Sequence, residues 1–384
     1  MKSYFGSKIC VALPAIEAEL SSRVPADQLR AMAVSLAGAV RNPSRAFTVQ
    51  ITAITLLSIA AAYGCAFFLG TRTPNLLSVY AGWSIVGLIL VGGSAVFAYT
   101  ILLLIRREPR PLRLVWARGR EYLTPSALAD RVLPIFLLFA FLGAFSVFKS
   151  MIPMMHPFAW DAAFSDLDRL IFGTDPWRIT HAVIGPVPTA LMDYAYIMWV
   201  PVFTCVVLWH SVFAKHEQKR RFFLSFFACW IILGVVLATI FSSAGPCFLD
   251  LINHPYAGRY PFFPLEYGGG SQRIMNYLAD GYLKGDFGMA KGISAMPSMH
   301  IAVVTLYLVA ARKPWTITLS AIYFTLIFVG SIHLGWHYAV DGIFAAIGTV
   351  LIYRMTAIGT RQQAYDECAG KPALAYDPNP RPVG

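Results

Sequence analysis

The chain has 384 residues, of which 57% are hydrophobic and only 13% charged, and its formal net charge is +11. Soluble domains carry about 25% charged residues, so this composition excludes an ordinary soluble protein and indicates an integral membrane protein. The positive charge would favour nucleic-acid binding only if it formed a patch, so the positions of the basic residues decide its meaning.

Long apolar runs mark the predicted membrane spans, because a helix needs about 20 such residues to cross about 30 Å of hydrocarbon. Eight runs approach or reach this length: 47–70, 77–105, 132–149, 187–213, 222–243, 299–311, 316–336 and 338–358. The run at 299–311 is the shortest. The sequence therefore predicts an all-α, polytopic membrane bundle of about eight transmembrane helices, with both termini on one side.

The basic residues indicate which side is cytoplasmic. Of the 31 lysines and arginines, 23 fall before residue 47, in 106–131, 214–221 and 312–313, or from residue 354 on. The positive-inside rule makes these segments cytoplasmic. The net charge is thus explained by topology, and no nucleic-acid partner is expected. The N-terminus lacks the apolar region and cleavage site of a removable signal peptide.

Two predicted outer segments are long. Residues 160–172 have apolar positions at helical spacing and end at Gly173, which predicts an amphipathic helix lying in the membrane interface. Asp161, Asp166 and Asp168 on it are expected to form its wet face, with a cation or polyol site as the alternative. Residues 244–296 are too long for a simple connection and favour a lid or substrate rim. Asp193, inside the fourth span, is expected to make a buried hydrogen bond.

Two short motifs carry the chemistry. Residues 297–300 read Pro-Ser-Met-His, and residues 337–341 read His-Tyr-Ala-Val-Asp. In the predicted topology His300 opens the sixth span, while His337 and Asp341 open the eighth, so all three lie at outer ends. They meet at one membrane surface if successive spans are antiparallel neighbours.

Two histidines and a carboxylate in this arrangement indicate acid–base and nucleophilic catalysis on a phosphate ester. His337 would attack phosphorus, while Asp341, one helical turn away, would hold its other N–H and stabilise the imidazolium. His300 would protonate the leaving alkoxide. Ser298 and the backbone N–H groups around it would hold the phosphate oxygens. The alternative without catalysis is a pair of packed core histidines with an aspartate that fixes their tautomer.

These motifs resemble those of the type 2 phosphatidic acid phosphatase superfamily. Pro-Ser-Met-His is similar to its second motif, Pro-Ser-Gly-His, and residues 334–341 resemble its third, Leu-Gly-x-His-Tyr-x-x-Asp. Residues 295–300, Ala-Met-Pro-Ser-Met-His, resemble the branch that contains inositol phosphorylceramide synthases more than they resemble ordinary members. The resemblance covers about 132–358 and implies a six-helix catalytic core, His337 as nucleophile, Asp341 as its partner and His300 as proton donor. It implies no metal and no other cofactor.

The resemblance also divides the chain. Before the core, it leaves a cytoplasmic N-terminal segment, 1–46, and two accessory transmembrane helices with a basic cytoplasmic loop, 47–131. The catalytic membrane domain follows at 132–358. Residues 359–384 are expected to be a disordered cytoplasmic tail.

The phosphate-binding cations of the family are not evident. Its third motif opens Ser-Arg, but Gly330 and Ser331 stand there, so that arginine is missing. The first motif, Lys-x6-Arg-Pro, has no recognisable counterpart. The expected substitutes are Lys291 and Arg259, followed by Arg273, and each has an ordinary solvated loop charge as its alternative.

His333 precedes His337 by four residues. An unbroken helix would place His333, His337 and Asp341 on one face, where they could bind a metal. Gly335 and Trp336 are expected to interrupt that helix, so no metal site is predicted. His333 and Ser331 are then candidates for supporting contacts around the site, or His333 is simply a packed histidine.

The predicted function is a lipid phosphatase or phosphotransferase that cleaves a lipid-linked phosphoester through phosphohistidine. Its donor would be a phospholipid or prenyl phosphate, and its acceptor either water or the hydroxyl of a lipid or polyol. The site would face the extracytoplasmic side of the cell's inner membrane. A non-catalytic transporter, using the histidines and Asp341 as a proton or metal path, is the alternative from a different class.

Overall fold

The computed structural model describes residues 43–261 and 269–369. Every regular element in these two ranges is helical, which confirms the predicted all-α fold. By its internal contacts the chain divides into residues 1–50 and 51–384. The packing described below belongs to the second unit. Most of the predicted N-terminal segment lies outside the described residues.

Six helical segments are long and apolar enough to cross a membrane. They are α3 (Pro43–Phe68), α4 (Leu76–Ile105), α6 with α7 (Pro125–Arg131, Leu133–Met155), α12 (His216–Ile231) with the π-helix Ile232–Leu237 and α13 (Ala238–Ile240), α16 (Pro314–His333) and α17 (Ala339–Ala369). A seventh would be the pair α10 (Pro186–Ile197) and α11 (Trp199–Val212), which is bent by 44°. The chain is therefore an integral membrane protein.

The sixth predicted span, at 299–311, does not reach the length of a membrane-crossing helix. It corresponds to α15 (Met299–Ala310), whose 12 residues extend only about 18 Å. This helix packs against α16, α17 and α12, and its residues 301–307 are all buried. Because protein rather than lipid surrounds it, α15 does not need the length of a lipid-exposed span.

The segments between the spans carry further helices. The helix predicted at 160–172 is confirmed as α8 (Asp161–Phe172), which ends at Gly173 with φ +74°. The predicted lid segment is largely structured, with 3-10 turns at Pro246–Phe248 and Ala257–Arg259 followed by α14 (Gly269–Lys284). The remaining helices are α5 (Pro111–Tyr122), in the basic loop, and α9 (Pro176–Val183).

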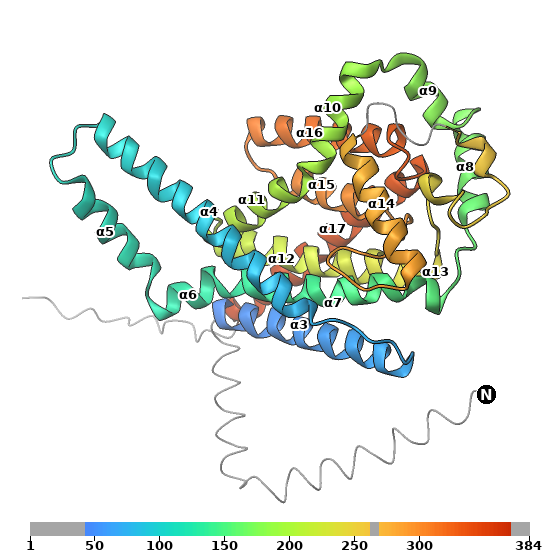
Figure 1. The fold of residues 1–384 in the computed structure, drawn as a ribbon. Coiled ribbons are helices and arrows are strands. Elements are labelled where there is room, and N and C mark those ends of the chain that lie inside the picture. Colours follow the sequence, from blue (N-terminus) through green and yellow to red (C-terminus); the bar gives the residue numbers. More distant parts are fainter. Residues whose placement is uncertain (1–42, 262–268, 370–384) are drawn as a thin grey trace, which may run out of the picture. The chain divides into compact units, whose positions relative to one another are not determined.

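Three of these shorter helices pack against the ends of the central spans. In Figure 1, α8 lies beside α17, α9 beside α16 and α14 beside α10, as their contacts require. They gather around the start of α17, where the second histidine motif lies. At its other end α17 runs to Ala369, so the predicted tail begins as a continuation of this helix, and residues 370–384 lie outside the described part.

Candidate active site

The structure brings the two histidine motifs together. Ser298 is the N-cap of α15, and its Oγ accepts a hydrogen bond from the backbone N–H of Ile301 at 3.5 Å. The backbone N–H of Ser298 donates to the carbonyl of Asp341 at 3.4 Å, which joins the start of α15 to that of α17. As a result the ring centroids of His300 and His337 are 6.3 Å apart.

His337 lies in a tight loop between α16 and α17. The first helix ends at His333, the chain reverses at Gly335, where φ is +75°, and the second begins at Ala339. Glycine suits this position because a Cβ disfavours positive φ. The backbone N–H of His337 donates to the carbonyl of Ser331 at 3.1 Å, which fixes the loop. The predicted interruption at Gly335 is confirmed, so a single helical face does not carry both histidines.

His337 and Asp341 form a buried pair. The Nδ1 atom of His337 lies 3.4 Å from Oδ2 of Asp341, and the same oxygen accepts the backbone N–H of Tyr338 at 3.1 Å. Burial, and to a smaller extent the nearby positive charge of Lys149, lower the pKa of the His337 imidazole to about 3, while a backbone hydrogen bond with Ala295 opposes them. A neutral ring is the form a histidine nucleophile requires.

His300 is held by aromatic rings rather than by hydrogen bonds. Its ring stacks on Tyr196, with centroids 4.7 Å apart, and lies 4.6 Å from the ring of Trp199. Tyr196 also stacks on Trp336 at 5.9 Å, so one aromatic side chain contacts both motifs. Within the described residues, the ring nitrogens of His300 have no hydrogen-bond partner from the chain. No sequence pattern indicates these contacts, because aromatic residues are common throughout the apolar spans.

Lys149 lies at the site, although it belongs to neither of the two histidine motifs. It lies near the end of α7, close enough for its charge to act on His337, and in the described part of the chain no carboxylate lies within ion-pair distance of it. The backbone at Lys149 also runs against Gly292, just before the first histidine motif. A signal was present, since Lys149 begins a Lys-x6-His-Pro sequence that ends at His156 and Pro157. This matches the spacing of the family's first motif, with histidine in place of arginine.

The two cations expected to bind phosphate already have carboxylate partners. Lys291 is buried, and its Nζ lies 2.6 Å from Asp286, a contact that raises the pKa of the ammonium. Arg259 contacts Asp166 at 2.8 Å and Asp175 at 2.5 Å. Their charges are therefore matched before any substrate binds. Arg273 lies in the first half of α14.

His333 is a packed histidine. Its Nε2 lies 2.8 Å from Oγ1 of Thr189 and its Nδ1 lies 3.1 Å from Oγ1 of Thr180. His181 in turn bonds to the carbonyl of His333 at 2.9 Å. This network anchors α9 and α10 to the end of α16. Among the residues that the structure describes, no group of three acidic, histidine or cysteine side chains could hold a metal ion.

The prediction that α8 carries a wet acidic face is wrong for two of its three aspartates. Asp161 and Asp168 are 1% and 2% exposed, whereas Asp166 is exposed as expected. Both buried carboxylates accept backbone N–H groups, a use that hydrophobic periodicity does not indicate. The buried hydrogen bond expected for Asp193 is confirmed, since it accepts the N–H groups of Gly270 and Ser271 at 2.9 and 2.7 Å.

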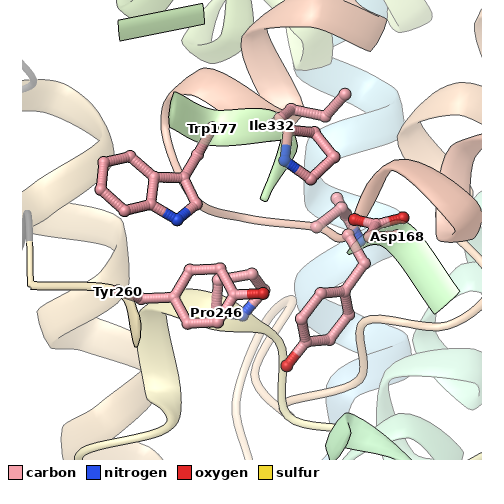
Figure 2. Close-up of a pocket in the computed structure, with 8 residues that line it drawn as sticks. Asp168, Trp177, Pro246, Tyr260 and Ile332 are labelled. Carbon is pink, nitrogen blue, oxygen red and sulfur yellow. The ribbon is translucent and has the colours of Figure 1, made fainter. Parts of the chain in front are cut away.

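A small pocket opens beside His337. Figure 2 shows Trp177 facing Tyr260 and Pro246 across it, with Asp168 on another side. His337 and Tyr338 complete this part of the wall. The pocket thus lies between the loop that carries His337, helices α8 and α9, and the segment after residue 245.

Comparison with known families accounts for this arrangement. A family model of the PAP2 superfamily matches residues 162–355, just over half of the 384 residues. The chain belongs to the PAP2 superfamily. No curated protein and no solved structure matches it. The region that matches the PAP2 superfamily contains His300, His337 and Asp341, and Lys149 precedes it. The family makes this a membrane protein of the phosphatase type, with a phosphoester as its substrate class.

Proposed function

We propose that this PAP2-superfamily protein cleaves a lipid-linked phosphoester through a phosphohistidine formed on His337. The observation that supports this most directly is the buried His337–Asp341 pair beside His300. Asp341 engages Nδ1, so Nε2 is the nitrogen that attacks phosphorus. Neutral His337 is nucleophilic, and the carboxylate stabilises the positive charge that develops as the P–N bond forms.

The reaction has two displacement steps. In the first, Nε2 of His337 bonds to phosphorus while the P–O bond to the leaving group breaks, and His300 gives its proton to the departing oxygen. In the second, water or an alcohol attacks the phosphohistidine, passes its proton to His300 and releases His337. The unbonded ring nitrogens of His300 suit this exchange, and its aromatic neighbours fix the plane of the ring.

We assign the phosphate-binding cation to Lys149. It is the site's cation without a carboxylate partner in the described residues, whereas Lys291 and Arg259 would have to leave Asp286, Asp166 or Asp175 to bind a substrate. The N-terminus of α15 adds backbone N–H groups, because Ser298 accepts those of Ile301 and Ala302 and leaves those of Met299 and His300 without a partner among the described residues. Together they would stabilise the charge on the phosphate oxygens.

The site is proposed to face the extracytoplasmic side of the cell membrane. The basic segments that include Arg110, Lys215 and Lys313 lie at the opposite ends of the spans from His300 and His337. By the positive-inside rule those ends are cytoplasmic. A phospholipid or prenyl phosphate in the outer leaflet would then present its headgroup to the site.

The acceptor decides between phosphatase and transferase. Attack by water would release phosphate, and attack by a lipid or polyol hydroxyl would give a new phosphodiester. The resemblance of residues 295–300 to inositol phosphorylceramide synthases favours transfer. The transporter alternative relied on His333 sharing a path with His337, and the two threonine contacts of His333 remove that support.

The deciding experiment uses purified protein in detergent with phosphatidate, a prenyl phosphate, and phosphatidylinositol with ceramide. Free phosphate and new phospholipid are measured together, with and without EDTA. Turnover that survives EDTA and is lost in His337→Ala, but kept in His216→Ala, supports the proposal. Full activity in His337→Ala would refute it. Phosphate release or a new phospholipid would identify the acceptor.

A further inference from the structure

Helix α8 reaches the catalytic loop through two buried carboxylates. Asp168 accepts the backbone N–H of Ala339 at 2.7 Å and that of Val340 at 2.9 Å. These are the first two residues of α17, so Asp168 acts as a helix cap supplied by a different helix. Its negative charge also suits the positive end of the α17 dipole.

Asp161 binds the same loop one residue earlier. Its Oδ1 accepts the hydroxyl of Tyr338 at 3.0 Å and the backbone N–H of Gly245 at 2.8 Å, and its Oδ2 accepts that of Ala244 at 2.8 Å. Tyr338 is 1% exposed, so this bond is shielded from water. Asp161 thus ties three segments together: α8, the loop at 244–245 and the residue after His337.

Between them the two carboxylates hold all three residues that separate His337 from Asp341. Residues 338–340 are the only covalent link between nucleophile and partner, so their placement sets the contact between Nδ1 and Oδ2. That contact is 3.4 Å long, and a hydrogen bond at this distance is lost on a small displacement of the loop. Among the described residues neither carboxylate forms a hydrogen bond with His337 itself, so both act through the backbone and Tyr338.

We propose that Asp161 and Asp168 are positioning residues that set the geometry of the His337–Asp341 pair. The proposal rests on the function proposed above, because it takes His337 as the nucleophile. It also replaces the earlier alternative of a cation or polyol site on α8. Every oxygen of the two side chains already accepts at least one hydrogen bond from the chain.

The activity test compares Asp168→Ala, Asp168→Asn and Asp161→Asn with Asp166→Asn, a matched change at the exposed aspartate of α8. Rates are expressed per folded molecule, with the folded fraction taken from size-exclusion chromatography. We expect kcat to fall at least tenfold in Asp168→Ala while KM for the lipid donor stays within twofold. Asp168→Asn should recover part of kcat, because its amide oxygen still accepts one N–H. Asp166→Asn should match the wild type.

A second measurement does not depend on turnover. Nitrogen-15 NMR of histidine-labelled protein reports the ring tautomer, and the His337 signal is identified by its absence in His337→Ala. We expect a single tautomer with the proton on Nδ1 in the wild type and Asp166→Asn, and a mixture in Asp168→Ala. An unchanged tautomer together with an unchanged kcat in Asp168→Ala would overturn the positioning role. A wild type inactive on every donor would instead count against the proposed function, and the tautomer alone would then decide the positioning role.

Discussion

At the scale of single residues, the structure changes which cation is expected to bind the phosphate beside His337. A phosphate with two negative charges needs a cation close to its oxygens. Lys149 provides one without a competing carboxylate among the described residues, and its charge already acts on the neighbouring imidazole. Lys291, in contrast, has Asp286 as a partner.

Replacement of Lys149 tests this assignment. We expect Lys149→Ala to lower kcat/KM about 100-fold or more, as loss of a group that stabilises transition-state charge does, and Lys149→Arg to keep part of the activity. Lys284→Ala is the control, since Lys284 is an exposed lysine paired with Asp280. Steady-state kinetics on the active donor would measure this. A larger loss in Lys291→Ala than in Lys149→Ala would reverse the assignment.

Asp168 should make stability depend on pH. Burial raises its pKa to about 7, and the charges of Asp341 and Asp175 act in the same direction, while the N–H bonds from Ala339 and Val340 oppose it. The folded protein then holds this proton more tightly than the unfolded chain. Its contribution to stability is therefore greatest below the ordinary aspartate pKa near 4 and is lost as pH rises toward 7, by up to about 1.4 kcal/mol per pH unit.

The measurement is thermal unfolding in detergent between pH 4.5 and 7.5 for the wild type and Asp168→Asn. Because other titrating groups are shared, the difference between the two proteins isolates Asp168. The wild type should gain stability relative to the variant as pH falls. Parallel curves would show that Asp168 does not titrate in this window.

At the scale of elements, the site depends on loops that cross closely rather than on the long spans alone. Gly245 has φ +94°, and a Cβ there would lie 2.8 Å from the carbonyl oxygen of Trp336. Both the backbone conformation and the space favour glycine. This close crossing holds the loop that carries His337, in addition to the bond from the backbone N–H of His337 to the carbonyl of Ser331.

Gly245→Ala should therefore lower the free energy of unfolding by about 1–3 kcal/mol and reduce activity with it. Gly82→Ala is the matched control, because Gly82 lies in α4 with open space around its Cα, and alanine favours a helix. Thermal unfolding of both variants in the same detergent would compare them. Equal melting temperatures for Gly245→Ala and the wild type would mean that the loops adjust freely.

At the scale of the whole molecule, the proposed orientation places the site on the extracytoplasmic face of the membrane. Substituted cysteines in a cysteine-free background can test it in intact cells. A membrane-impermeant maleimide should label Arg169→Cys, at an exposed polar position of α8, and should leave Ala117→Cys in α5 unlabelled until the cells are opened. The reverse pattern would place the site in the cytoplasm.

The sequence by itself determined the membrane class, the all-α fold, most of the spans and the two histidine motifs. These follow from local properties: the length of an apolar run, the periodicity of α8, and residues four apart such as His337 and Asp341. The same local reasoning located Gly335 as the break between α16 and α17. It also contained the Lys-x6-His-Pro segment from Lys149 to Pro157, which differs from the family's first motif by a histidine in place of arginine.

Only the tertiary structure decided which charges act at the site and which are already paired. Asp161 and Asp168 lie on a helix whose pattern indicated an exposed acidic face, yet both are buried against the loop that carries His337. Their partners are backbone N–H groups and a tyrosine more than 70 residues away, and a local pattern holds no information on such contacts. A carboxylate is stable when buried only where donors converge on it, and that convergence exists only once the helices have packed.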